Sequence, residues 1–153
     1  MKWRDDSGNA MLEFTFLGVL LLVPLVYAVV TALTVEKAAY AVTAASREAG
    51  RVYVSAGADD TAYGRAFAAA QVVMRDQGLD LADGELEISC EYDPCSTAGG
   101  LVHVRIDRSV DLPLVPALGS TTPSIAVHGR HDEVVSCFLV GAAQAPPGET
   151  RCP

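Results

Sequence analysis

The sequence lacks the short motifs by which many enzymes and nucleic-acid-binding proteins are identified. It has no Gly-rich phosphate loop, no Cys/His set with zinc-ligand spacing and no nucleophile elbow. Basic residues are scarce, since 11 Lys and Arg stand against 19 Asp and Glu, for a net charge of −8. Affinity for nucleic acid depends on clustered Lys and Arg beside the phosphates, so this balance argues against such a partner. We therefore expect no catalytic site, cofactor or small-molecule substrate, and no nucleic-acid partner.

Charge is absent from one long stretch of the chain. Half of the 153 residues are hydrophobic by type, and residues 14–35 form a run of 22 without a charged side chain. A bilayer core about 30 Å thick needs about 20 apolar residues in a helix. The run therefore predicts a single transmembrane span in a chain that is otherwise charged and has the length of one domain.

Two simpler interpretations of this run remain open. A secretory signal peptide has an apolar region of about 7–15 residues followed by a small-x-small cleavage site. Ala39-Tyr40-Ala41 offers such a site, but the run is too long for that class. A plain membrane anchor would need no feature beyond the run itself. Both interpretations leave the sequence before the span unexplained.

A single carboxylate lies at the N-terminal border of the apolar run. The carboxylate is that of Glu13, and a charge at membrane depth usually has a functional partner. Glu13 is the fifth residue after Gly8, which suggests what that partner is. If a peptidase cuts between Gly8 and Asn9, the new α-amino group lies about one helical turn from Glu13 and can neutralise it. The pair can form within one chain or between neighbouring subunits. The alternative is an interfacial Glu13 that reaches the headgroups beside Lys2 and Arg4.

This N-terminal pattern resembles that of the type IV pilin-like prepilins, and among them the TadE-like proteins of tight-adherence (Tad/Flp) pili. The matching residues are Gly8, Met11-Leu12-Glu13-Phe14 and Ala44-Ala45-Ser46-Arg47-Glu48-Ala49-Gly50-Arg51. The resemblance covers roughly residues 4–54. It implies a minor pilin (pseudopilin) that a prepilin peptidase cuts after Gly8, with Glu13 serving peptidase recognition and subunit register.

The same resemblance implies partners and a role. The partners are the prepilin peptidase, other pilin-like subunits, the Tad assembly platform and membrane lipid. The role is in the assembly of Tad-type pili, and so in adhesion and surface colonisation. A rival hypothesis from a different class is a permanently anchored, single-pass extracytoplasmic domain that binds a ligand or an envelope partner.

The N-terminal charges predict the orientation of the span. Lys2, Arg4 and the α-amino group precede it, and positive-inside counting gives the acids Asp5 and Asp6 little weight. We therefore expect a cytoplasmic N-terminus, a cytoplasmic (inner) membrane location and an extracytoplasmic C-terminal domain. The pilus is a further location that the resemblance implies.

The cysteines favour the same orientation independently. All four lie beyond the span: Cys90, Cys95, Cys137 and Cys152. An even number confined to the exported part implies disulfides in an oxidising compartment. Cys90 and Cys95 flank a short turn-like segment, so one pairing is Cys90–Cys95 with Cys137–Cys152. The alternative, Cys90–Cys137 with Cys95–Cys152, remains open at the level of sequence.

The helical pattern does not stop at the membrane. Apolar residues continue at three- and four-residue spacing from Val35 to Val52, which predicts one helix over residues 9–54. Ala41, Ala45 and Ala49 repeat every four residues and would let another helix approach closely. The apolar face of this stem can pack on its own domain, on neighbouring subunits, or on both.

A second helix and a small sheet are predicted next. Asp59 or Asp60 is expected to cap the helix, and Gly78 to end it. Its apolar stripe is Tyr63, Phe67, Ala70 and Met74, at helical spacing. Period-two alternation then predicts strands around residues 85–91, 102–107 and 125–139, the third broken or bulged near Gly129. The prolines within residues 112–116 place that segment outside the sheet interior.

These elements predict an α+β fold in which the second helix packs on a small antiparallel sheet of about three strands. The expected parts are a cytoplasmic leader (1–8), the N-terminal helix (9–54), the head (55–141) and a loose C-terminal tail (142–153). A head of this size buries only a modest core, so we expect disulfides to assist it.

One cluster has the composition of a metal site. It consists of His128, His131, Asp132 and Glu133. On a strand, His128 and Asp132 share one face while His131 and Glu133 share the other, so no metal site is predicted. His103 has no partner that sequence can supply, and no catalytic set is predicted around it.

Overall fold

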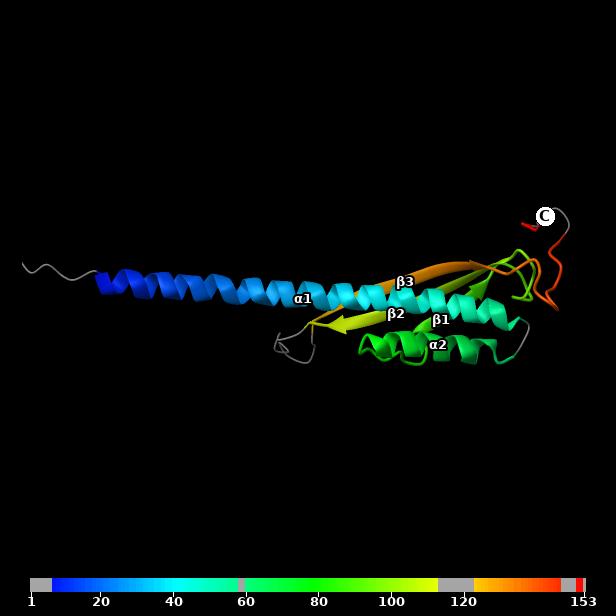
Figure 1. The fold of residues 1–153 in the computed structure, drawn as a ribbon, viewed down its shortest axis with the longest axis horizontal. Helices are drawn as coiled ribbons and strands as arrows, with labels where there is room; N and C mark the ends of the chain where they lie inside the picture. The colour runs from blue at the N-terminus through cyan, green and yellow to red at the C-terminus, as the bar shows by residue number, and fades with distance from the viewer. Residues whose placement is uncertain (1–6, 58–59, 113–122, 147–150, 153) are drawn as a thin grey trace, which may run out of the picture.

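The fold follows from a computed structural model that describes residues 7–57, 60–112, 123–146 and 151–152, with side chains of the first helix described from residue 10 onward. The elements are α1 (Ser7–Ala56), α2 (Ala62–Asp76), β1 (Leu86–Cys90), β2 (Leu101–Asp111) and β3 (Ser124–Val134). The two helices lie side by side along one three-stranded sheet (Figure 1). The predicted α+β class and the number of elements are confirmed. Leader residues 1–6, Asp59, the prolines between residues 113 and 122, and tail residues 147–150 lie outside the described parts.

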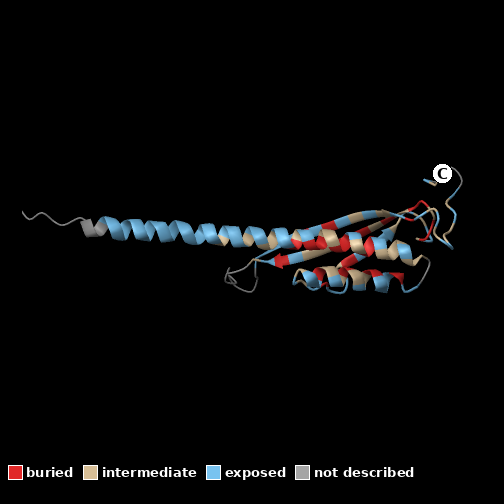
Figure 2. Ribbon diagram, viewed as in Figure 1, coloured by how far each residue is buried: buried red, intermediate tan, exposed pale blue. Residues whose placement is uncertain are grey.

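Helix α1 is a single element of 50 residues with Pro24 inside it. At 1.5 Å per residue it is about 75 Å long. Its first half projects away from the head with its side chains exposed, and its second half is buried along one face (Figures 1 and 2). The predicted continuation of the apolar segment into a stem is therefore confirmed, with the helix starting at Ser7 and ending at Ala56.

The small residues of the stem are buried inside the head, where α1 contacts both α2 and the sheet. Ala38, Ala41, Val42, Ala45 and Ala49 are all buried in the hydrophobic core of the head. The close approach that their spacing predicted is therefore used within the subunit. The opposite face of the stem is left exposed to solvent (Figure 2).

A glycine on the sheet makes this close approach possible. A Cβ atom at Gly129 would lie 2.3 Å from the carbonyl oxygen of Val42. Gly50 on α1 is a second close point, because its Cβ would meet the side chains of His131, Glu133 and Val104 at 3.3–3.4 Å. Backbone approaches backbone here, so any side chain at residue 129 would push α1 off the sheet.

Helix α2 starts later than predicted, and its buried stripe agrees with the prediction in part. Thr61 occupies the N-cap position, so Asp60 lies one residue before the cap. The buried residues are Ala62, Ala66, Ala70 and Met74. Phe67 is half-buried against the core and stacks on Tyr63, which is 45% exposed. The predicted stripe is therefore confirmed at Phe67, Ala70 and Met74 and wrong at Tyr63, because Ala62 and Ala66 are buried on that turn of α2 instead.

The predicted end of α2 is confirmed. Gly78 has a φ of +68°. Its N–H donates to the Arg75 carbonyl at 2.8 Å, and the Leu79 N–H donates to the Met74 carbonyl at 3.0 Å. These bonds satisfy the last carbonyls of the helix, which glycine allows by adopting the left-handed conformation.

The sheet has the order β1-β2-β3, with both pairs antiparallel. One face meets the helices through buried side chains: Leu86, Val102, Val104, Ile106, Val110 and Val127. Strand β3 continues without a bulge through Gly129, which pairs with Ile106. The expected break near Gly129 was wrong, because the glycine serves the contact with α1 and leaves the strand regular.

The third strand also ends sooner than predicted. It stops at Val134, and Val135, Cys137 and Leu139 lie in a turn at the far end of the head. The Val135 N–H donates to the Gly100 carbonyl at 2.9 Å, and the Leu139 N–H to the Ser136 carbonyl at 3.1 Å. Apolar residues alternate with others in this segment as they do in a strand, but of these three only Val135 and Leu139 pack on the core.

The C-terminal tail is held rather than loose in its described residues. The Ala143 N–H donates to the Ser96 carbonyl at 3.2 Å, and the Ala143 carbonyl accepts from Ala98 at 2.8 Å. Farther along, Arg151 bonds to Glu91 and Cys152 is cross-linked to Cys137. The prediction from its Pro- and Gly-rich sequence missed these contacts because each partner is distant along the chain.

Candidate functional site

The predicted processing site lies in the first turn of α1. Gly8 and Asn9 belong to the helix, which starts at Ser7, while their side chains lie outside the described set. Asn9 and Glu13 are four residues apart on this helix, so they lie on the same face about one turn apart. Glu13 is exposed and makes no ion pair with any residue that the structure describes.

The apolar part of α1 has the length and composition of a membrane span. Within the described chain, one helix, Ala10–Ala56, is long and apolar enough to cross a bilayer, and its most apolar stretch is unburied. The Thr15 and Thr34 hydroxyls donate to the Met11 and Val30 carbonyls at 2.8 and 2.9 Å, so neither needs water. The Thr31 hydroxyl oxygen differs, since it is enclosed but has no partner among the described residues.

The four cysteines form two cross-links at the end of the head remote from the exposed part of α1. The Cys90–Cys95 S–S distance is 2.02 Å and that of Cys137–Cys152 is 2.04 Å. Of the two pairings that the sequence left open, the structure has the first. The cross-links are themselves joined, because Arg151 donates to Glu91 at 2.6 and 3.2 Å and to the Gly99 carbonyl at 3.2 Å.

The ion pair between Arg151 and Glu91 makes this end of the head sensitive to acid. The Arg151 guanidinium, helped by the Leu101 N–H, holds the pKa of Glu91 below its ordinary value. A lowered folded-state pKa contributes stability above the unfolded pKa of about 4.3, and that contribution is lost as the pH falls through the folded pKa. The contribution of this ion pair to the tail attachment is therefore present near neutral pH and lost in acid, while the Cys137–Cys152 disulfide holds the tail under both conditions.

We expect Glu91→Gln to reduce the loss of thermal stability that the head undergoes in acid. In the full chain in detergent micelles, the Tm of the head should fall between pH 5 and pH 3, and the fall should be smaller in the variant. Glu36→Gln is the matched control, because Glu36 is exposed on α1 and has no ion pair among the described residues. The measurement is the near-ultraviolet circular dichroism of the tyrosines during heating. An equal fall in wild type and Glu91→Gln would contradict the assignment.

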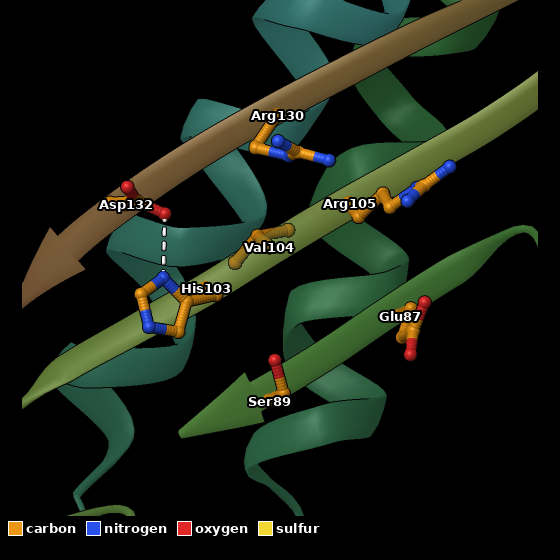
Figure 3. A pocket seen from close by; sticks show the side chains of 7 residues that line it. All are labelled: Glu87, Ser89, His103, Val104, Arg105, Arg130 and Asp132. Carbon is orange, nitrogen blue, oxygen red and sulfur yellow. Dashed lines mark hydrogen bonds and ion pairs between the residues drawn. The ribbon is translucent and has the colours of Figure 1, made fainter. Parts of the chain in front are cut away.

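The open face of the sheet carries a ladder of polar side chains (Figure 3). Ser89, His103 and Asp132 lie opposite one another on β1, β2 and β3, and Nδ1 of His103 is 2.7 Å from Oδ1 of Asp132. Two residues farther along β2, on the same face of the sheet, Arg105 lies opposite Arg130 on β3. These residues line a shallow depression of about 370 Å³. Within the described contacts no hydrogen bond joins Ser89 to His103, so the three do not form an assembled nucleophile–base pair.

Most charges on this face are neutralised by a neighbour. Arg105 donates to Asp107 through Nε at 2.7 Å, and Nδ1 of His128 lies 2.5 Å from the other Asp107 oxygen. The Arg105 guanidinium and then His128 hold the pKa of Asp107 below its ordinary value. His131 pairs with Glu133 at 2.8 Å on the opposite face. Each pair is internal to the sheet, so the face has the character of a solvated, salt-bridged surface.

The predicted split of the His128 cluster is confirmed. His128 and Asp132 face solvent, whereas His131 and Glu133 are half-buried against α1. Among the described residues there is no group of three or more His, Cys, Asp and Glu that could hold a metal ion. The partner of His103, which sequence could not supply, is Asp132 on a strand 29 residues away. Comparison with protein-family models, curated proteins and solved structures found no match to this chain.

Proposed function

We propose that this chain is a membrane-anchored minor pilin-like subunit of the TadE-like kind. In this proposal a prepilin peptidase cuts it after Gly8, and it acts in the assembly of Tad-type pili, in adhesion and in surface colonisation. The observation that carries the proposal is one unbroken helix that links three features. These are Glu13 at the N-terminal border of the apolar run, the run itself (residues 14–35) and a stem that packs on the exported head.

The proposed mechanism assigns a task to each part of α1. The apolar part holds the subunit in the inner membrane, with Lys2 and Arg4 on the cytoplasmic side, until the assembly platform extracts it. After processing, the α-amino group of Asn9 and the Glu13 carboxylate neutralise one another within a chain or across neighbouring subunits. Neutralisation removes the cost of a charge at membrane depth, and the pairing between chains sets the register of the helices.

The head is the part that other exported components would meet. Removal of residues 1–8 takes away two bases, Lys2 and Arg4, and two acids, Asp5 and Asp6, so the mature chain keeps a net charge of −8. The two disulfides support the part of this proposal that puts the head in an oxidising compartment. The exported surface is therefore acidic and cross-linked at its far end.

The proposal is tested by the start of the mature chain. The protein is extracted from membranes of its native host, and its intact mass and N-terminal sequence are measured. We expect a chain that begins at Asn9. A chain that begins at Met1 would overturn the proposal in favour of a permanently anchored binding domain. A chain that begins after Ala41 would identify the run as a secretory signal peptide.

A further inference from the structure

The most exposed large apolar side chains lie at the far end of the head. Phe138 is 87% exposed and Val140 is 97% exposed, more than any other large hydrophobic side chain that the structure describes. Leu139 between them points inward, packs against the core and faces Gly57 at the end of α1. The turn therefore holds two apolar side chains in water while the third anchors it.

This turn is held in place before any partner arrives. The Leu139 N–H donates to the Ser136 carbonyl at 3.1 Å, and the Ala142 N–H donates to the Leu139 carbonyl at 3.2 Å. The Cys137–Cys152 disulfide fixes one side of the turn. Binding would therefore order few additional groups, which favours affinity. Rigid, exposed apolar anchors of this kind are typical of interaction surfaces.

A hollow of about 320 Å³ opens beside the same turn. It is lined by Tyr53, Gly57, Asp60, Tyr63, Asp93 and Pro94, among others. Gly57 connects the two features, because the Leu139 side chain packs 3.8 Å from the position of a Gly57 Cβ. The turn that carries Phe138 and Val140 is therefore anchored, through Leu139, beside a residue that lines the hollow.

The chemistry of the hollow suits a cationic side chain. Asp60 and Asp93 are exposed, and neither makes a hydrogen bond or ion pair with any residue in the described part of the chain. Two unneutralised carboxylates attract Lys or Arg, and the neighbouring rings of Tyr53 and Tyr63 can add cation–π attraction. The ladder on the open sheet face differs, since most of its charges are already paired.

We propose that this distal site, formed by Phe138, Val140, Asp60 and Asp93, binds a basic and apolar segment of another exported protein. An apolar side chain of the segment packs on Phe138 and Val140, and a Lys or Arg enters the hollow. A second copy of the chain is disfavoured as the occupant, because two ends bearing unpaired carboxylates would repel each other in a protein of net charge −8. The anchoring membrane is disfavoured too, because the site is at the end remote from the span (Figure 1).

Site-directed photo-crosslinking tests the site in the full chain. Phe138→p-benzoylphenylalanine is introduced in the native host, the cells are irradiated, and the adduct is identified by mass spectrometry. The matched control carries the same photo-residue at Val72, which is 58% exposed on α2. We expect an adduct to another exported protein at position 138, on a peptide that combines Lys or Arg with apolar residues, and little adduct at position 72.

The carboxylates are tested in the same background. Asp60→Asn with Asp93→Asn should lower the yield of adduct about fivefold, the loss expected from two exposed ion pairs. Asp83→Asn, which removes a charge from an exposed residue elsewhere, should leave the yield unchanged. Unaltered near-ultraviolet circular dichroism checks the fold of each variant.

Four results would overturn the proposal: no adduct at position 138, equal adducts at both positions, an adduct to a second copy or to lipid, or a yield insensitive to the Asp60 and Asp93 changes. Processing after Gly8 plays no part in this test. Its outcome is therefore independent of the N-terminal mass that tests the proposed function.

Discussion

Replacement of Gly129 by alanine is expected to disrupt the packing of the head. The new Cβ would lie 2.3 Å from the Val42 carbonyl oxygen and 3.0 Å from the Thr43 nitrogen. Both are backbone atoms of α1, so no side-chain rotation can relieve the clash. The helix must shift off the sheet, which opens the core around Val42 and Ala45. We expect a loss of about 3 kcal/mol or more in the free energy of unfolding, at the upper end of overpacking effects.

Denaturant unfolding of the full chain in detergent micelles measures this loss, with the tyrosine near-ultraviolet circular dichroism as the signal. Gly64→Ala is the matched control. Gly64 is in the first turn of α2 and a Cβ there meets nothing within 4 Å. The alanine should stabilise the helix by about 0.5–1 kcal/mol, because it loses less conformational entropy than glycine. If Gly129→Ala were as stable as wild type, the close contact between α1 and β3 would be incorrect.

Gly8→Leu is expected to abolish processing while leaving membrane insertion intact. The bond between Gly8 and Asn9 lies in the first turn of α1, so a peptidase must unwind that turn to reach it. Glycine is about 1 kcal/mol worse than alanine in a helix, which makes the turn easy to open. Leucine both stabilises the helical turn and places a bulky side chain beside the scissile bond. The apolar run, which we propose inserts into the membrane, is unchanged.

Intact mass of the membrane-extracted variant is the measurement, and a chain that retains Met1–Gly8 is the expected result. Gly18→Leu is the matched control, since it makes the same change ten residues along α1 at a position where a Cβ meets nothing within 4 Å. Normal trimming of Gly8→Leu would show that the site is misplaced. Impaired trimming of both variants would point to an effect on the helix as a whole.

The sequence predicted the elements whose signals are local. The apolar run and its three- and four-residue continuation predicted α1 almost to its ends, because helical periodicity depends on neighbours along the chain. Gly78 was correctly placed at the end of α2, because a left-handed residue there is a property of a few adjacent bonds. Alternation likewise predicted the first two strands.

The errors share one cause. The placement of Tyr63 in the core stripe, the break at Gly129 and the extension of the third strand to Leu139 all concern which surfaces touch. Helix α1 approaches the sheet so closely at Gly129 that no side chain fits there, and α2 buries Ala62 and Ala66 while Tyr63 stays exposed. A hydrophobicity pattern predicts that a face is buried but says nothing about the distance to the surface that covers it.

The candidate sites divide in the same way. Gly8, Asn9 and Glu13 could be proposed from sequence because five residues of spacing on a helix define their relation. The sequence offered the observed cysteine pairing as one of two alternatives but could not choose between them. The Arg151–Glu91 bond across 60 residues and the distal site around Phe138 could not be foreseen, since each joins segments far apart in the chain. Their partners are chosen by strand register and by the turn after β3.

The sequence by itself determined that this chain has one long apolar helix with an acid at its mouth and an acidic, cysteine-bearing α+β head. Composition and periodicity are sufficient for that, because each residue's preference acts over a few neighbours. Only the tertiary structure decided that the small-residue stripe of the stem is buried within its own head, that Phe138 and Val140 are exposed, and that Asp60 and Asp93 line one hollow. Contacts between distant segments set these features, and the close approach of α1 at Gly129 brings the stem and the sheet together.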